Sequence, residues 1–340
     1  MATIKDVAQK AGVTVGTVSR AFNGYSDISE KTRQSILRVA AEMGYVPNLH
    51  AKSLSLKNKT NIAMLISGIL DEHQTDEIAY LLMKGAYQFA QEANFEIATY
   101  AIDRKSQQEK TYAQFCYEHS LGGALLFGLR TVDPYFKNLK KSTAPCVAVD
   151  VSLKGPNVGS VMIDDEAAFD DLTEYLIRNG HRSIAVLYGR RQAEVSVKRW
   201  AGARRAFERH GIACPKEQVL YTDFSQARAY RLTKEYLQRY KTSGATAFLC
   251  MSDITAIGAM QAIKETGYRV PQDFSIVGYD GLNITRYTDP GITTIDQNTQ
   301  IKGYAAAKLL SEIMADPKAA RQIVLPHRLV VRGSVRRLEK

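Results

Sequence analysis

Hydrophobic and polar positions alternate in two different ways, and the change falls near residue 60. Through residue 45, apolar residues recur every three or four positions in short stretches that are broken at Gly12 and at Asn23–Gly24. This spacing predicts short amphipathic helices. From Asn61 onward, short apolar runs alternate with longer amphipathic stretches, which predicts an α/β region.

Three short helices fit the first region. Thr3 and Asp6 can form a capping box at the start of the first helix, and Gly12 ends it. Thr14 can cap the second helix, and Ser29 can cap a third that runs through EKTRQSILRVAAEM. Two short helices joined by a tight glycine-containing turn are typical of a helix-turn-helix unit.

The second region predicts parallel sheets. Its strand-like runs are NIAMLIS, FEIATY, GALLFG, PCVAVD, SIAVLYG, QVLYTD, TAFLCM and FSIVGYD, and helices such as DEIAYLLMKGAYQFAQEA and VKRWAGARRAFERHG lie between them. Such βαβ units build doubly wound sheets, and their number indicates two lobes with a ligand at the carboxyl ends of the strands. The chain lacks GxGxxG after a first strand and lacks GxxxxGK[ST], so neither a dinucleotide site nor a P-loop is predicted.

Charge points to the partner of the first region. The 340 residues carry a net charge of +10, and residues 1–59 hold nine Lys or Arg against four Asp or Glu. About half of the excess therefore lies in the first sixth of the chain, which indicates a polyanionic partner there. Residues 47–60 are polar and basic, and we interpret them as a linker between domains at 1–46 and 61–340.

Other composition features exclude several classes of protein. The start MATIKDVAQKAG lacks the apolar run of a signal peptide, and no stretch approaches a membrane span, so we expect a cytoplasmic protein. The four cysteines form no CxxC pair, and we expect buried reduced thiols rather than a metal or redox site. The six histidines show no metal-ligand or catalytic spacing. We therefore expect no metal, no cofactor and no enzyme activity.

The motifs TIKDVAQKAGVTVGTVSRAFNG, ISEKTRQSILRVAAEMGYVPN and AKSL resemble the DNA-binding head and hinge of the lactose-repressor/galactose-repressor family. RNGHRSIAVLYG, SDITAIGAMQAIKETGYRVPQDFSIVGYD and ITTIDQN resemble its ligand-binding core. The resemblance spans essentially the whole chain. It implies an all-α helix-turn-helix head and an α/β core of two periplasmic-binding-protein-like lobes, acting as a sequence-specific transcriptional repressor.

The outer face of the second helix carries the predicted DNA chemistry. At about 100° per residue, Val18 and Ala21 point inward and Arg20 points outward. On a recognition helix in the major groove, Arg20 can donate to guanine, and Val15 can contact a thymine methyl group. The alternative is that Arg20 is a solvated surface charge. The predicted DNA-binding residues of the head are Thr14, Val15, Gly16, Thr17, Ser19, Arg20, Asn23, Ser29, Lys31 and Thr32.

The linker resembles the family's hinge helix, which pairs with its partner in the minor groove of the operator. The resemblance implies that Leu54 inserts between base pairs; alternatively, Leu54 is a buried anchor on the core. The predicted contacts of this segment are Asn48, His50, Ala51, Lys52 and Leu54. An isolated helix of this length is marginal in water, so we expect it to form only on DNA.

Polar residues at predicted strand ends suggest a ligand site. Asp150, Asp253 and Asp280 each follow an apolar run, and such groups could serve an enzyme or a polyol binder. The resemblance implies that the effector contacts Arg199, Asp280, Phe224, Ser252, Asp253, Asp150, Gln297 and Gln74. Asp253 could instead cap the helix beginning at ITAIGAM. Tyr188 and Trp200 are expected in the core.

The segment SGILDEHQTDEIAY, residues 67–80, is more polar than the family's pattern, which favours a hydrophilic effector, plausibly a sugar. A nucleobase or a phosphorylated carrier protein acting as corepressor is the alternative, and a sugar carrier or an enzyme on the same scaffold is a remote one. The resemblance implies lobe crossings near residues 161, 292 and 323. The lobes would then be 61–161 with 293–322, and 162–292 with 323–340.

The family's assembly is a homodimer on a near-palindromic operator, with no membrane partner. Helices 73–93 and 252–266 contain the apolar positions that we assign to the dimer interface. The C-terminal RGSVRRLEK has no heptad repeat, so a dimer is expected rather than a tetramer. Whether the effector releases or promotes DNA binding is left open.

Overall fold

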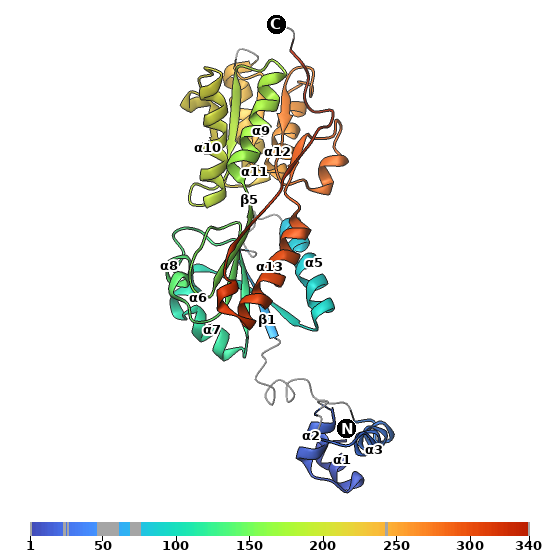
Figure 1. Cartoon of the computed structure of the whole chain (residues 1–340). Coiled ribbons are helices and arrows are strands. Elements are labelled where there is room, and N and C mark those ends of the chain that lie inside the picture. The colour runs from blue at the N-terminus through green and yellow to red at the C-terminus, as the bar shows by residue number, and fades with distance from the viewer. Residues whose placement is uncertain are drawn as a thin grey trace. The chain divides into compact units, whose positions relative to one another are not determined.

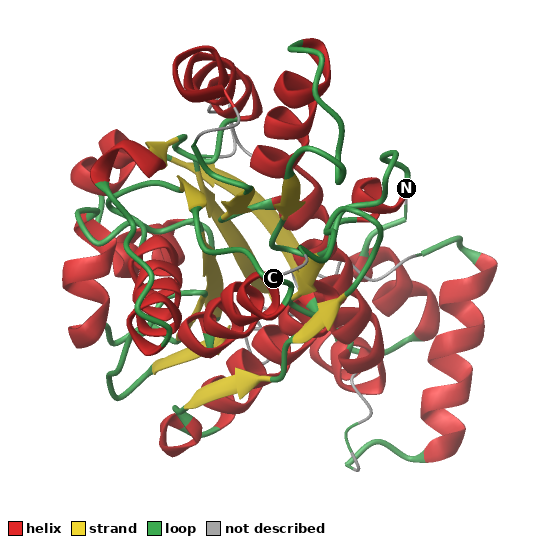
Figure 2. Cartoon of the chain, turned by 90° about the horizontal axis from the view of Figure 1, so that it is seen from above, coloured by secondary structure: helices red, strands yellow, loops and turns green. Residues whose placement is uncertain are grey.

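The computed structural model describes residues 2–22, 25, 27–45, 61–68, 76–241 and 244–338. It separates into two units, Met1–Lys59 and Thr60–Lys340, which we call the head and the core and describe one at a time (Figure 1). The predicted fold class is confirmed, because the head consists of helices and the core contains two parallel sheets with helices around them (Figure 2). In the described residues, no helix is long and apolar enough to cross a membrane.

The head contains the three predicted helices, α1 (Ile4–Ala11), α2 (Val15–Phe22) and α3 (Glu30–Glu42). The capping box at Thr3 is confirmed, since its hydroxyl accepts from the Asp6 N–H and the Asp6 carboxylate accepts from the Thr3 N–H. The residue after α1, Gly12, is left-handed with φ = 66°, a conformation that favours glycine. Val7, Val18 and Ile36 are fully buried and hold the three helices together.

The first lobe of the core is built on a six-stranded parallel sheet in the order β11-β5-β4-β3-β1-β2. Its strands are β1 (Asn61–Ser67), β2 (Glu96–Ile102), β3 (Gly123–Phe127), β4 (Cys146–Val149), β5 (Val158–Ile163) and β11 (Gln322–Leu325). Its helices are α5 (Asp76–Ala93), α6 (Arg104–Glu109), α7 (Tyr112–Glu118), α8 (Pro134–Asn138) and α13 (Thr299–Ala315). Ile62 and Met64 pack toward α5 and α13, whereas Ala63 and Leu65 pack toward the opposite face, because neighbouring side chains alternate along a strand.

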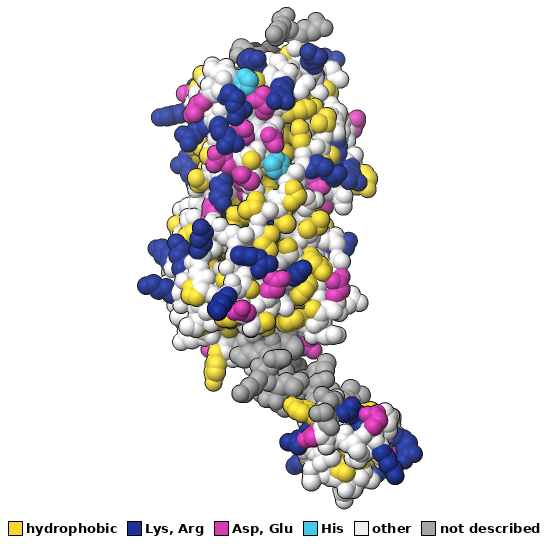
Figure 3. All heavy atoms as spheres, in the orientation of Figure 1, with side chains coloured by type: hydrophobic (Ala, Val, Ile, Leu, Met, Phe, Trp, Pro, Cys, Tyr) yellow, Lys and Arg dark blue, Asp and Glu magenta, His cyan; other side chains and the backbone are white. Residues whose placement is uncertain are grey.

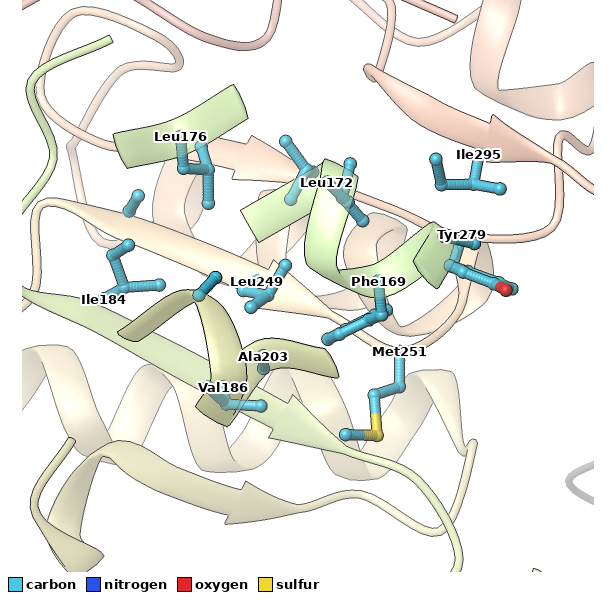
Figure 4. Packing of buried hydrophobic residues seen from close by; sticks show 14 of the residues in the cluster. Phe169, Leu172, Leu176, Ile184, Val186, Ala203, Leu249, Met251, Tyr279 and Ile295 are labelled. Atoms are coloured by element: carbon cyan, nitrogen blue, oxygen red, sulfur yellow. The ribbon is translucent and has the colours of Figure 1, made fainter. Parts of the chain in front are cut away.

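The second lobe has a four-stranded parallel sheet in the order β7-β6-β8-β9. Its strands are β6 (Ile184–Tyr188), β7 (Val219–Tyr221), β8 (Ala247–Cys250) and β9 (Ser275–Val277). Its helices are α9 (Asp165–Arg178), α10 (Glu194–Arg209), α11 (Gln226–Tyr240) and α12 (Asp253–Glu265). Figure 4 shows Phe169, Leu172 and Leu176 of α9 against Ile184 and Leu249 of the sheet, and this packing forms one face of the lobe's core.

The two lobes exchange chain later than the sequence predicted. Ile163 and Leu325 still pair in the first sheet, so the first and third crossings lie near residues 164 and 326 rather than 161 and 323. Residues 293–296 bridge to the β9 region of the second lobe, and α13 then packs on the first lobe. The second crossing therefore lies near residue 297 instead of 292. The strand pairings thus place each crossing a few residues beyond its approximate expected position.

The segment IVLPHRLVVR forms two strands that belong to two different sheets. Pro326 separates β11, in the first sheet, from β12 (Arg328–Val330), which pairs antiparallel with β10 (Thr294–Asp296). Proline has no N–H for a sheet ladder, and the chain changes lobe at this residue. The strand β5 was absent from the predicted set, and the glycine in its sequence VGSVMI explains why its propensity is weak.

Two glycines let α5 and α13 approach closely. A Cβ on Gly85 would lie 1.9 Å from the Gln300 carbonyl oxygen, and one on Gly303 would lie 2.0 Å from the Leu82 carbonyl oxygen. Both distances are far inside contact range, and the obstacles are backbone atoms. The helices therefore pack backbone to backbone at this point, on the face of the first sheet that they cover.

Replacing Gly303 by alanine is expected to lower the free energy of unfolding of the core by about 1–3 kcal/mol, because the added methyl group overpacks this contact. Urea unfolding of the full chain measures the change. Gly16→Ala is the matched control, since its Cβ would meet only the Thr14 hydroxyl, at 3.7 Å; helix propensity there favours alanine by up to about 1 kcal/mol. Equal stability of Gly303→Ala and the wild type would contradict the close approach.

Candidate functional site

A cavity of about 140 Å³ that opens to solvent lies between the two lobes of the core. It is lined from both lobes by residues that follow the carboxyl ends of strands, where ligands bind in doubly wound sheets. Six of the predicted effector residues line this cavity, namely Asp150, Arg199, Phe224, Ser252, Asp280 and Gln297. The structure thus brings together residues that are up to about half of the chain apart.

A buried lysine organises the wall of the cavity near the lobe crossing. Lys302, in the first turn of α13, is 1% exposed and donates to Asp150 Oδ1 at 2.6 Å and to Gln297 Oε1 at 2.8 Å. Gln297 Nε2 in turn donates to Asp280 Oδ1 at 2.5 Å. These bonds join Asp150 of the first lobe to Asp280 of the second lobe. Lys302 was not predicted as a site residue, because a lysine at this position looks like any other polar residue of an amphipathic helix.

Arg199 is held inside the second lobe. Its Nε donates to Asp165 Oδ1 at 2.8 Å, its Nη1 donates to the Met251 carbonyl at 2.6 Å, and its guanidinium lies 3.8 Å from the centre of the Tyr279 ring. The Asp280 carboxylate lies 3.9 Å from Nη1. Burial alone would lower the pKa of Arg199. The nearby Asp165, Tyr279 and Asp280 raise this pKa by more than burial lowers it, so the guanidinium stays charged. Arg199 therefore supports the fold of the lobe as well as facing the cavity.

Asp280 presents an unusual carboxyl group to the cavity. Burial raises its pKa well above the ordinary aspartate value, and the nearby Arg199 lowers it only in part. Its Oδ2 is buried and has no hydrogen-bond partner in the described residues. A neutral carboxyl can donate one hydrogen bond and accept another, so Oδ2 is suited to a ligand hydroxyl.

Asp253 does not line the cavity, and the prediction that it contacts the effector is not supported. It is fully buried; its Oδ1 accepts from the Thr294 hydroxyl at 2.6 Å and its Oδ2 accepts from the Leu282 N–H at 2.8 Å. The alternative, that it caps α12, is also wrong. Ser252 is the N-cap, accepting from the Thr255 N–H, and Asp253 is the first helical residue, turned toward the following loops.

Strained backbone marks the strand ends around the cavity. Asp150, Phe224 and Asp280 have φ values of 61°, 63° and 129°, which side-chain-bearing residues rarely adopt. Such strain persists where the surrounding structure imposes it, often at functional sites. The ring of Phe224 packs against Gly189, where a Cβ would lie 2.3 Å from it. Glycine at this position lets the aromatic face reach the cavity.

The structure adds cavity residues that the sequence did not indicate. The cavity is also lined by Phe127 at the end of β3, by Arg130 and Arg190 in the loops after β3 and β6, and by Glu194 at the start of α10. The rule that ligands lie beyond strand ends could have suggested Arg130 and Arg190, since both closely follow predicted strands. Tyr188 and Trp200, expected in the core, do pack together there, with ring centres 6.1 Å apart.

The outer face of α2 in the head is open, as predicted. Val18 and Ala21 are buried, whereas Thr14, Val15, Gly16 and Arg20 are exposed. Lys and Arg side chains are spread over the face of the head seen in Figure 3. Thr14 Oγ accepts from the Thr17 N–H at 3.2 Å, so Thr14 caps α2. The face combines one exposed valine, a residue without a side chain and one long cation.

The remaining predicted DNA-binding residues, of the head and of the linker, fall into two groups. The Ser29 hydroxyl caps α3 by accepting from the Thr32 N–H, Lys31 is exposed beside them, and Thr17 and Ser19 are half-buried on α2. The other group lies outside the described residues and comprises Asn23, Asn48, His50, Ala51, Lys52 and Leu54. The same holds for the predicted effector residue Gln74. These predictions stay untested.

Arg20 is paired within the head. Its Nη1 lies 2.7 Å from Asp27 Oδ2, and both side chains are at least half exposed. An exposed pair of this kind adds little stability, and the Asp27 carboxylate would repel DNA phosphate. Asp27 therefore competes with any nucleic-acid partner for Arg20.

Asp27→Asn is expected to tighten binding to duplex DNA of random sequence about two- to five-fold, which corresponds to the about 0–1 kcal/mol of an exposed ion pair. The melting temperature of the head should hardly change. Fluorescence anisotropy at one fixed salt concentration measures the affinity, with Glu30→Gln as a control that removes an acid from α3. Unchanged affinity of Asp27→Asn would show that Arg20 and Asp27 do not face DNA.

The helices assigned to the dimer interface differ in their exposed surface. On α5, Tyr80 and Tyr87 are exposed, which leaves that prediction open. On α12, Ala256, Ala259 and Ile263 are packed inside the second lobe. Ile257 of the same helix is only partly buried, so the interface prediction for α12 also stays open.

Cysteines and possible metal ligands add no further site. Cys116, Cys146 and Cys250 are buried, Cys214 is half-buried, and all four are free thiols. Burial raises the pKa of Cys214 to about 11, so its thiol is unreactive at neutral pH. Within the described part of the chain, no three His, Cys, Asp or Glu side chains gather closely enough to hold a metal ion.

Comparison with known proteins identifies both units. Residues 3–48 match the family described as bacterial regulatory proteins, lacI family, and residues 173–335 match a periplasmic binding protein-like domain. The HTH-type transcriptional repressor PurR of Aliivibrio fischeri (strain MJ11) is 28% identical over 337 residues, covering 98% of each chain.

Two solved structures share the fold along nearly the whole chain. The Lac repressor dimer bound to operator and the anti-inducer ONPF has a TM-score of 0.86 at 26% identity, covering 98% of this chain and 99% of that one. The complex of the transcriptional regulator CelR with cellobiose has a TM-score of 0.72 at 27% identity, covering 98% and 100%. The helix-turn-helix head, the two-lobed core and these matches agree: the chain belongs to the lacI family of bacterial regulatory proteins.

Proposed function

We propose that this protein is a cytoplasmic transcription repressor that binds a near-palindromic operator as a homodimer. A small hydrophilic effector, a sugar, binds between the lobes of the core and changes the affinity for the operator. The observation that carries this proposal is the cavity in which Asp150 from one lobe and Arg199, Asp280 and Phe224 from the other converge. Charged and hydroxyl groups recognise sugar hydroxyls, and an aromatic face covers the C–H surface of a sugar ring.

The head supplies the sequence-reading surface. We assign base contacts to Arg20 and Val15, since Arg reads guanine and an apolar side chain reads the thymine methyl group. Gly16 makes no side-chain contact, so the helix can approach the bases closely. Thr14 and the residues at the start of α3, Ser29, Lys31 and Thr32, contact the phosphate backbone and set the register.

The linker makes a second contact in the minor groove. We assign to Leu54 the insertion between base pairs that kinks the operator, and to His50 and Lys52 contacts with phosphates. Ala51 keeps the helix backbone close to the DNA. The Lac repressor structure with which this chain shares its fold contains an operator, which supports a DNA-bound dimer as the working form.

The effector acts through the relative position of the two lobes. Ligand contacts come from both lobes, and three chain crossings near residues 164, 297 and 326 connect them. A ligand that binds one lobe arrangement more tightly shifts the population toward it. The two recognition helices of a dimer must lie one helical turn apart on a palindromic site, so a small lobe rotation is enough to change operator affinity.

Selection of duplexes from a random library by the full-length protein tests the proposal. We expect enrichment of a near-palindromic site, and we expect Arg20→Ala to lose specificity at one base position per half-site while keeping most of its affinity for random DNA. Operator affinity is then measured with monosaccharides, disaccharides, nucleobases and nucleosides. Failure to enrich any site would refute the DNA-binding proposal, and a response to a nucleobase alone would favour the alternative effector class.

A further inference from the structure

The acidic groups of the cavity are already matched by the protein. Asp150 is paired with Lys302. Glu194 lies 2.7 Å from Lys198 Nζ and also accepts from the Ser152 N–H at 3.2 Å. Cation partners thus neutralise both carboxylates, which leaves them as fixed acceptors rather than as sites for a cationic ligand.

Two guanidinium groups line the same cavity and differ in their partners. Arg130 lines it from the first lobe, and its Nε lies 3.3 Å from Oδ1 of the buried Asp133. Arg190 lines the cavity from the second lobe, and its side chain has no hydrogen bond or ion pair with any residue that the structure describes. The neighbouring Arg191 differs, because its guanidinium lies over the Tyr221 ring at 3.8 Å.

The loops that carry the two arginines touch each other. The Thr131 N–H and hydroxyl both donate to the Gln192 carbonyl, at 3.3 and 3.2 Å. Each of these residues is within two positions of Arg130 or Arg190. The contact between these loops joins the two lobes beside the arginines, so each lobe contributes one guanidinium group to the same cavity.

We propose that the effector carries an anionic group, a carboxylate or a phosphate, which binds between Arg130 and Arg190. The effector is then a sugar acid or a sugar phosphate rather than a neutral sugar. This inference rests on the proposed function, in which a carbohydrate occupies the cavity. Guanidinium groups donate in a fork that suits either anion.

The other end of the cavity fits the uncharged part of such a ligand. Burial raises the pKa of Asp280, and its unpartnered Oδ2 can bond a sugar hydroxyl. The anion also bridges the two lobes, so its binding would be coupled to the lobe arrangement that controls DNA binding.

Calorimetric titration of the full-length protein tests the inference at constant ionic strength. The probes are matched pairs: galactose with galacturonate, glucose with glucuronate and glucose 6-phosphate, and inorganic phosphate as the bare anion. We expect an anionic member to bind at least tenfold more tightly than its neutral parent. Arg190→Gln and Arg130→Gln should each weaken anion binding about 10- to 100-fold, the range for a charged hydrogen bond.

Arg191→Gln is the matched control, and it should bind every probe as the wild type does. Comparing the affinity for the sugar acids with that for glucose 6-phosphate shows whether the anionic group is a carboxylate or a phosphate. A neutral sugar that binds more tightly than its acid and phosphate, or wild-type anion affinity in Arg190→Gln, would overturn the inference. So would the absence of binding by every anion, phosphate included.

The two proposals fail differently. If phosphate binds through Arg130 and Arg190 but no carbohydrate changes operator affinity, the anion site stands and the sugar part of the proposed function falls. If a neutral sugar changes operator affinity while every anion is ignored, the proposed function stands and the anion site falls.

Discussion

Replacing Arg199 by methionine is expected to lower the free energy of unfolding of the second lobe by about 3–5 kcal/mol, because it leaves the buried carboxylate of Asp165 without its cation. Asp165 is 2% exposed, and its remaining side-chain partner is the Tyr279 hydroxyl, 2.8 Å from Oδ1. The Met251 carbonyl also loses its donor. Urea unfolding measures the loss, and fluorescence of the single tryptophan, Trp200, reports on this lobe because it is the next residue along α10.

A double variant separates the charge from the packing. Asp165→Asn removes the negative charge with little change of shape, so Arg199→Met combined with Asp165→Asn should lose clearly less stability than the sum of the two single variants. Full additivity would mean that the pair does not interact in the folded protein. Wild-type stability of Arg199→Met alone would show that the guanidinium is not part of the lobe's structure.

This expectation changes how effector experiments on Arg199 are read. A variant that loses ligand binding could have lost the ligand contact or the shape of the lobe. Gln297 is no easier to replace, since its amide donates to Asp280 Oδ1 and accepts from the buried Lys302. Effector titrations should therefore be made first with variants whose unfolding curves match the wild type.

Acidification from pH 7 to pH 4 is expected to change the stability of the second lobe through two buried groups, and their effects on stability have opposite signs. Burial lowers the pKa of His181 from 6.5 to about 4, so the unfolded chain takes up the proton first and stability falls as the pH drops through this window. Burial raises the pKa of Asp253 from 3.8 to about 6, so the folded chain takes up the proton first and stability rises over pH 6 to 4. Each effect is about 3 kcal/mol.

The hydrogen bonds explain why His181 resists protonation. The Thr246 hydroxyl donates to the Ser183 carbonyl at 3.2 Å, so it accepts from His181 Nδ1–H at 2.9 Å. Nε2 is then the unprotonated nitrogen, and it is buried without a partner in the described residues. Adding a proton there would bury a charge close to the Arg336 cation, and burial is the main reason why the pKa of His181 is lowered.

The two groups can be separated by substitution. His181→Asn keeps a donor for Thr246 and removes the titration, so this variant should keep more of its stability than the wild type as the pH falls from 6.5 to 4. Asp253→Asn can bond both Thr294 and Leu282 and should lose the gain in stability below pH 6. Urea midpoints followed by Trp200 fluorescence measure both. Parallel pH profiles for His181→Asn and the wild type would contradict the assignment.

The sequence by itself determined the head and the class of the core. Thr3, Asp6, Gly12 and Ser29 act on residues three or four positions away, so their pattern encodes the helix ends directly. Most strands of the core could also be located from local sequence, because a parallel sheet covered on both faces leaves continuous apolar runs. The set of cavity residues from Asp150 to Gln297 came from motifs, with the strand-end rule as its physical basis.

The tertiary structure alone decided which polar groups are partners. Lys302 pairs with Asp150, which is 152 positions away, and Asp253 bonds Thr294, 41 positions away. Arg130 and Arg190 meet at one cavity only because the loop contact between Thr131 and Gln192 joins the lobes. Burial and pairing set the charge of each group, and both depend on residues brought together by the fold. A local sequence pattern contains no information about contacts between residues that are far apart in the chain. The sequence therefore indicated the cavity but not the pairing and charge of the groups that line it.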